Sequence, residues 1–211
     1  MSPTSATSAT SAQPRPLIEG WAITALAAAG IAATTVVILA AGQMTEPALR
    51  VALRITARAS FVLFVAAFTA SAAHRLWPGR FTRWQRRNRR YLGLAFAASH
   101  AIHAAAIVSF AVVAPAAFHD HTARTNPIPA TIAYAFIVAM AVTSFDRPAA
   151  WLGRRAWAAL HSIGSFYIWA TFLISFASRA LRMPGYWLPV AVVVAAMAIR
   201  IVAWRVTAPK R

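Results

Sequence analysis

The stretch that decides the fold is Arg89–Phe110, RRYLGLAFAASHAIHAAAIVSF. It opens with two arginines and continues as an apolar run long enough to cross a bilayer, which takes about 20 residues. His100 and His103 lie deep inside this run, three residues apart, so on a helix they share one face. Ionisable side chains at membrane depth are costly and usually face the interior of a helix bundle, where they mark functional sites. The stretch therefore predicts a membrane-spanning helix that carries a functional site.

The composition of the whole chain agrees with a membrane protein. Of its 211 residues, 60% are hydrophobic and 12% are charged. The 21 Lys and Arg residues far outnumber the 4 Asp and Glu residues and cluster at the ends of apolar blocks. Membrane topology therefore explains the positive charge better than nucleic-acid binding does, and we expect a lipid bilayer as the environment. The absence of cysteine excludes disulfides, iron–sulfur ligation and haem attachment through thiols.

The apolar blocks predict an all-α membrane protein, a bundle of six transmembrane helices within residues 20–207. A Ser/Thr-rich stretch, residues 1–19, precedes the bundle and is expected to be a disordered tail. The first apolar block is as long as a full span, which favours a retained helix over a cleaved signal segment. The expected spans are residues 20–41, 56–73, 91–118, 128–145, 156–177 and 185–204.

The distribution of basic residues predicts the orientation. Six spans place both termini on one side of the membrane. The two tails and the connections after the second and fourth spans carry 14 of the 21 basic residues, and the other three connections carry 6. Because cytoplasmic loops are enriched in Lys and Arg, both termini are expected in the cytoplasm.

A second deep histidine, His161, lies in the fifth expected span, which runs in the same direction as the third. Neutral imidazole is well suited to hold haem iron, and small residues beside the histidines would let a porphyrin approach both helices. We therefore predict one b-type haem clamped by His103 and His161. His103 lies 13 residues beyond Arg90 and His161 six beyond Arg155, an offset expected to shrink if the third helix starts below the membrane surface.

Two alternatives stay open for these histidines. His100 is either the ligand in place of His103 or a hydrogen-bonding neighbour of the ligand. The other possibility is that the small residues serve tight helix packing and each histidine hydrogen-bonds an adjacent helix.

Two basic stretches also have two interpretations each. Arg50, Arg54 and Arg58 recur every four residues, so they form either an interfacial helical face that touches headgroups or a site for an acidic partner, a haem propionate or a quinone. The connection from Arg75 to Arg90 either sets the topology alone or docks an acidic flavoprotein, since complementary charge accelerates encounter.

Two segments match the pattern of a known family. Their matching residues are Arg89, Arg90, Leu92, Gly93, Leu94, Phe96 and His103 in the third span, and Thr143, Ser144, Leu152, Gly153, Trp157, Leu160 and His161 around the start of the fifth. In these residues the chain resembles the ferric reductase-like transmembrane family, especially the haem-binding membrane subunit of the bacterial methionine sulfoxide reductase system. The resemblance implies a six-helix haem-binding bundle in the inner (plasma) membrane, with His103 and His161 as ligands of the haem nearer the cytoplasm.

The chain departs from that family where a second, outer haem would be held. The family's further histidine on the fifth span is replaced by Ile174, and the matching position on the third span is Ala117. A second haem therefore lacks its ligands, unless His119 takes part. His119 and His121 flank Asp120 and could hold a metal ion, although the sequence shows no further ligand for it.

The sequence thus predicts a membrane electron-transfer subunit that passes electrons from a quinol or flavoprotein to a partner reductase or acceptor. Haem b is the expected cofactor, and a quinone or FMN is a further candidate. The chain has no GxGxxG motif, so it is not expected to act alone as an NAD(P)H enzyme. The rival hypothesis is a cofactor-poor scaffold or assembly protein of the same fold. A transporter is less well supported, because no expected span contains a buried carboxylate.

Overall fold

The computed structural model describes residues 18–123 and 126–207, apart from the side chains of His121 and Thr207. Among these residues there are α-helices and one short 3-10 helix, and no β-strand. Five helices are long and apolar enough to span a membrane, and a sixth span results if two helices joined by a 108° bend count as one. The prediction of an all-α membrane bundle is thereby confirmed. Most of the tail expected at residues 1–19 lies outside the described residues.

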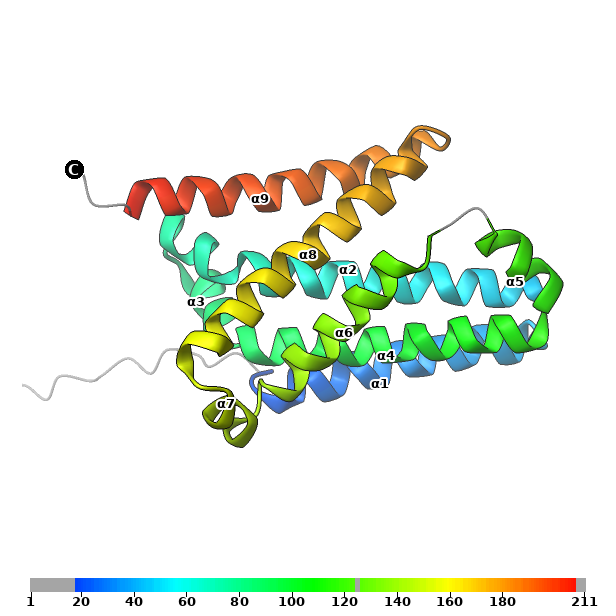
Figure 1. The fold of residues 1–211 in the computed structure, drawn as a ribbon, viewed down its shortest axis with the longest axis horizontal. Coiled ribbons are helices and arrows are strands. Elements are labelled where there is room, and N and C mark those ends of the chain that lie inside the picture. Colours follow the sequence, from blue (N-terminus) through cyan, green and yellow to red (C-terminus); the bar gives the residue numbers. More distant parts are fainter. Residues whose placement is uncertain (1–17, 124–125, 208–211) are drawn as a thin grey trace, which may run out of the picture.

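Long helices form the body of the bundle, and short ones form its connections (Figure 1). The long helices are α1 (Trp21–Ala41), α2 (Glu46–Leu76), α4 (Arg89–Val113), α6 (Ile128–Val142), α8 (Arg154–Ala180) and α9 (Trp187–Thr207). The short ones are α3 (Arg80–Arg87), α5 (Pro115–Thr122), α7 (Asp146–Leu152) and the 3-10 helix η1 (Pro184–Tyr186).

Several helix boundaries differ from the expected spans. The second span is part of one continuous helix, α2, which also contains the three regularly spaced arginines. The third expected span, residues 91–118, is interrupted at Ala114, where the backbone leaves the helical region before Pro115 starts α5. A residue before proline is pushed out of the α conformation, and proline is tolerated in the first turn of a new helix. The connections after the second and fourth expected spans contain the helices α3 and α7, which were not predicted from the sequence.

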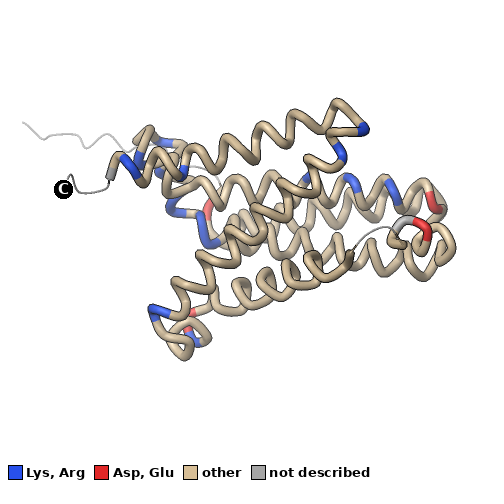
Figure 2. The backbone as a smooth tube through the Cα atoms, turned by 45° about the horizontal axis from the view of Figure 1, so that its top comes forward, with Lys and Arg blue, Asp and Glu red and all other residues tan. Residues whose placement is uncertain are grey.

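The long helices are arranged in two layers. Helices α1, α2 and α4 lie side by side, while α6 and α8 pack together and cross them at an angle; α9 packs on α2 and α8 (Figure 1). We call the end of the bundle with α3, α7 and the last turn of α9 the α3 end, and the opposite one, with α5 and the α8–α9 connection, the α5 end. Figure 2 shows that Lys and Arg lie mostly toward the two ends.

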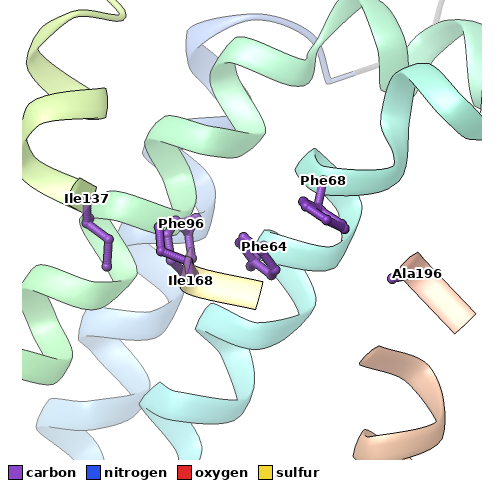
Figure 3. Close-up of a cluster of buried hydrophobic side chains, with 6 residues drawn as sticks. All are labelled: Phe64, Phe68, Phe96, Ile137, Ile168 and Ala196. Carbon is purple, nitrogen blue, oxygen red and sulfur yellow. The ribbon is translucent and has the colours of Figure 1, made fainter. Parts of the chain in front are cut away.

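An aromatic core joins the two layers. Five helices each contribute to one cluster of buried side chains, shown in Figure 3: Phe64 and Phe68 from α2, Phe96 from α4, Ile137 from α6, Ile168 from α8 and Ala196 from α9. The rings of Phe64 and Phe68 are stacked with centroids 5.2 Å apart, and the ring of Phe96 lies 5.4 Å from that of Phe64. This cluster fixes how α8 lies across α2 and α4, and so determines which residues of α4 and α8 face each other.

The close packing at the turn between α1 and α2 predicts that one added methyl group lowers the stability of the protein. A Cβ atom at Gly42 would overlap the Cβ of Ala48 and lie 3.1 Å from the carbonyl oxygen of Ile38. We expect Gly42→Ala to lower the free energy of unfolding by about 1–3 kcal/mol, the usual effect of overpacking, measured by thermal unfolding in detergent. Gly30→Ala is the matched control, because a Cβ there meets nothing within 4 Å. Equal losses in the two variants would contradict the prediction.

Candidate functional site

His103 of α4 is bound to α2 through a threonine. Its Nδ1 lies 2.7 Å from Oγ1 of Thr56, which is fully buried. The same Oγ1 lies 2.8 Å from the carbonyl oxygen of Ala52. A hydroxyl group has one hydrogen, and a carbonyl can only accept, so Thr56 donates to Ala52. We therefore assign the proton of the His103 ring to Nδ1, so that Thr56 accepts from Nδ1–H while its own hydrogen is donated to Ala52.

This hydrogen bond selects the tautomer of His103. With the proton on Nδ1, the Nε2 atom of the neutral ring carries a free lone pair. Metal-binding histidines typically have this arrangement, in which the second nitrogen donates to an oriented acceptor. His103 is therefore prepared to act as a ligand through Nε2.

His100 lies one turn before His103 and is surrounded by rings from three helices. Its ring centroid is 5.8 Å from that of His103 and 4.6 Å from that of Phe96, both on α4. It is 5.5 Å from the ring of Tyr134 on α6 and 6.1 Å from that of Phe172 on α8. His100 is thus the point where α4, α6 and α8 meet.

Two polar atoms at this point lack hydrogen bonds. Nδ1 of His100 and the hydroxyl oxygen of Tyr134 are buried, and neither has a partner in the described part of the chain. More than 90% of buried polar groups in proteins are hydrogen-bonded, and exceptions often mark functional sites. These two atoms indicate where a ligand with hydrogen-bonding groups would be accommodated, next to His103.

His161 of α8 is held by α6. Its Nε2 lies 3.1 Å from Oγ1 of Thr143, which donates to the carbonyl oxygen of Ala139 at 2.7 Å. By the same reasoning as for Thr56, we assign the proton of the His161 ring to Nε2, which leaves its lone pair on Nδ1. The ring also stacks on Trp157 at 4.2 Å between centroids. Ligation through Nε2 would require His161 to give up its bond to Thr143.

The structure brings His100 and His103 together but leaves His161 at another level of the bundle. The α8 side chain that meets His100 is Phe172, 11 positions after His161, which is about 16 Å of helical rise. Both α4 and α8 run from the α3 end to the α5 end (Figure 1), so His103 lies still further from His161. Since metal–imidazole bonds are about 2 Å long, two axial nitrogens on one iron lie about 4 Å apart. In this arrangement His103 and His161 do not meet on one iron.

At the level of His103, α8 presents aromatic rings rather than a ligand. Phe172 and Phe176 pack against Phe61 of α2, with centroids 5.3 Å and 4.8 Å away. Ile174, which stands where the family has its further histidine, is 68% exposed on the outside of the bundle. No second histidine therefore stands opposite His103 in the described part of the chain, and the clamp by two histidines does not fit the arrangement seen here.

The histidines at the α5 end do not form a metal site among the described residues. His119 and Asp120 are exposed in α5, with 3.9 Å between Nδ1 and Oδ1. The side chain of His121, the other residue considered for this site, lies outside the described residues. No group of three or more His, Cys, Asp or Glu residues that could hold a metal ion occurs in the described part of the chain.

Sequence reasoning missed the residues that orient the histidines. Thr56 selects the tautomer of His103 from a different helix, 47 positions away in the chain. Thr143 was included in the family pattern without a role, and Tyr134 was not singled out. A threonine or tyrosine in a predicted span is a common residue, so its contact with a histidine becomes apparent when the helices are packed.

Comparison of the chain with protein-family models, with curated proteins and with solved structures gives no match.

Proposed function

We propose that this chain is a membrane electron-transfer subunit that binds b-type haem through His103. The observation that supports the proposal is the hydrogen bond between His103 and Thr56, which with the proton on Nδ1 leaves the lone pair of His103 on Nε2. The orphaned polar atoms of His100 and Tyr134 beside it also support a ligand at this point. The resemblance of the segments around His103 and His161 to the ferric reductase-like family points to the same cofactor.

In this proposal each neighbouring side chain has a defined task. His103 would hold the haem iron through Nε2, and Thr56 would keep the proton of the ring on Nδ1. His100 and Tyr134 offer hydrogen bonds to polar groups of the ligand, and Phe96 and Phe172 exclude water. Bound haem would supply one-electron chemistry at its iron.

The proposed partners follow from the charge distribution. The α3 end carries most of the basic residues, so we place this end and both termini in the cytoplasm. The proposed membrane is the inner (plasma) membrane. The arginines of α3 and its flanks are suited to an acidic flavoprotein. A quinol, or a flavoprotein with FMN, is the proposed donor, and a separate reductase subunit the proposed acceptor.

The test measures the number of haems per chain and the number of histidines that bind the haem iron. The protein is purified in detergent, and oxidised and dithionite-reduced spectra are recorded with a pyridine haemochrome assay. We expect one b haem per chain, at least a tenfold loss of haem in His103→Ala, and binding of carbon monoxide by the reduced protein, because no second histidine faces His103. His119→Ala is the control, since its exposed side chain lies in α5, and it should keep the haem.

Other outcomes would change the proposal. Loss of haem in both His103→Ala and His161→Ala, with no carbon monoxide binding, would show that the two histidines do share one iron and that α8 shifts along α4 to bring them together. A folded protein without haem, even with haem supplied during expression, would exclude the electron-transfer function.

The second candidate function is a cofactor-free membrane scaffold. The observation that favours it is the environment of His161, whose bond to Thr143 and stacking on Trp157 serve the packing of α6 against α8. If this function is correct, His161→Ala destabilises the bundle, and neither His161→Ala nor His103→Ala changes an absorption spectrum in the visible range.

A further inference from the structure

A cavity at the α5 end of the bundle has no histidine among its lining residues. It has a volume of about 780 Å³ and lies between α2, the end of α8, η1 and the start of α9. Its walls are mostly apolar, and they include Phe61, Val62, Phe176 and Leu188. Arg58 of α2 and Arg182, just after α8, are its two charged lining residues. The cavity thus combines an apolar groove with two positive charges.

The two arginines have no ion-pair partner in the described part of the chain. The four carboxylate side chains of the protein each lie close to another basic residue, in the pairs Glu19–Arg87, Glu46–Arg50, Asp146–Arg90 and Asp120–His119. Arg179, near Arg182 in the chain, bonds to the carbonyl oxygen of Ser175. The carboxylate side chains of the protein are thus engaged elsewhere, which leaves Arg58 and Arg182 open to an anion from another molecule.

The position of the cavity along the bundle indicates what this molecule is. Helix α8 ends at Ala180, and α9 begins at Trp187, so the cavity opens where two spans leave the membrane. Tyr186 lines it, and Tyr and Trp are typical of the membrane–water interface. Val62 and Leu188 are 65% and 73% exposed, so the apolar wall continues into the surface that faces lipid. Charge at headgroup level next to an apolar groove matches the form of a phospholipid.

We propose that this cavity is a binding site for an anionic phospholipid. Arg58 and Arg182 hold the phosphate, to which guanidinium groups can donate two parallel hydrogen bonds. One acyl chain lies along Phe61, Val62 and Leu188. A quinone would fit the apolar groove as well, but it is uncharged and leaves the two guanidinium charges uncompensated. The inference does not depend on the haem.

The experiment measures lipid selectivity directly. The full chain is placed in nanodiscs, and the fraction of immobilised spin-labelled phosphatidylglycerol is compared with that of phosphatidylcholine. We expect a clear preference for phosphatidylglycerol, which falls about tenfold when Arg58→Gln and Arg182→Gln are combined, since each removes a charge-assisted hydrogen bond. Arg54→Gln is the matched control, because Arg54 is one turn away on α2 and does not line the cavity; it should keep the preference.

A second variant tests the groove without altering charge. Val62→Trp adds bulk to an exposed wall position and is expected to reduce the immobilised fraction of both lipids.

An unchanged preference in the double arginine variant, with helicity like that of the wild type, would overturn the proposal. Displacement of the lipid by millimolar inorganic phosphate would instead identify a soluble phosphate compound as the ligand. Displacement by a quinone analogue at constant lipid would identify a quinone site.

Discussion

Thr56→Val is expected to weaken haem binding by about 10- to 100-fold, the usual effect of removing the hydrogen-bond partner of a metal-binding histidine. Valine has nearly the same shape as threonine, so the packing between α2 and α4 should persist. It cannot accept the Nδ1–H bond of His103, so the ring is free to place its proton on Nε2, and in that tautomer Nε2 has no lone pair for the iron. The measurement is a haem titration of the apoprotein, followed by absorbance.

A second readout separates tautomer selection from general damage. In the protein without haem, nitrogen NMR of labelled histidine should show the proton of His103 on Nδ1 in the wild type and a mixture of tautomers in Thr56→Val. Thr35→Val is the control, because Thr35 of α1 is buried and bonds to the carbonyl oxygen of Ile31 in the same way. Equal haem loss in the two variants, or an unchanged tautomer in Thr56→Val, would show that Thr56 does not set the state of His103.

The spans could be predicted from the sequence because membrane insertion depends on quantities that are local in the chain. A helix needs about 20 apolar residues to cross the hydrocarbon, and α1 and α9 follow from their apolar runs. The short helices α3 and α7 were missed for the same reason, since a polar connection shows no apolar run whether or not it is helical. Helix α3 is held by distant contacts: Gln85 donates to the carbonyl oxygen of Ala66 at 2.7 Å, and Trp84 to that of Ile18 at 2.9 Å.

The sequence was sufficient to predict which residues belong to the candidate site, but not how they are arranged in space. The depth of His103 within an apolar run identified it as a candidate, and its place next to His100 follows from helical periodicity. The sequence shows the difference in depth between His103 and His161, but it does not show whether the packing of the helices removes that difference. Whether α8 is shifted toward α4 depends on which side chains interlock, and here Phe172 meets His100 while His161 binds Thr143. The expected reduction of the offset does not occur in this structure.

Asn88→Ala is expected to lower the free energy of unfolding by about 2–4 kcal/mol, since two hydrogen bonds are lost and the part-buried N–H of Gly20 is left without its partner. Asn88 is 3% exposed at the α3–α4 junction. Its Oδ1 accepts from the backbone N–H of Gly20 at 2.8 Å, and its Nδ2 donates to the carbonyl oxygen of Trp84 at 2.9 Å. One side chain thereby fastens the start of α1, a helix outside the aromatic core, to the junction of α3 and α4.

Thermal unfolding in detergent, followed by circular dichroism, measures this loss. Asn126→Ala is the matched control, because Oδ1 of Asn126 accepts from the backbone N–H of Ile128 at 3.0 Å in an exposed position, where water can replace it. Its loss should stay within about 1 kcal/mol, as for an exposed helix cap. Since Asn88 acts on α1, its variant should also make the start of α1 accessible to protease before the rest of the bundle. Similar stability of the two variants, with α1 protected in both, would mean that lipid and the packing of α1 on α4 hold this helix without Asn88.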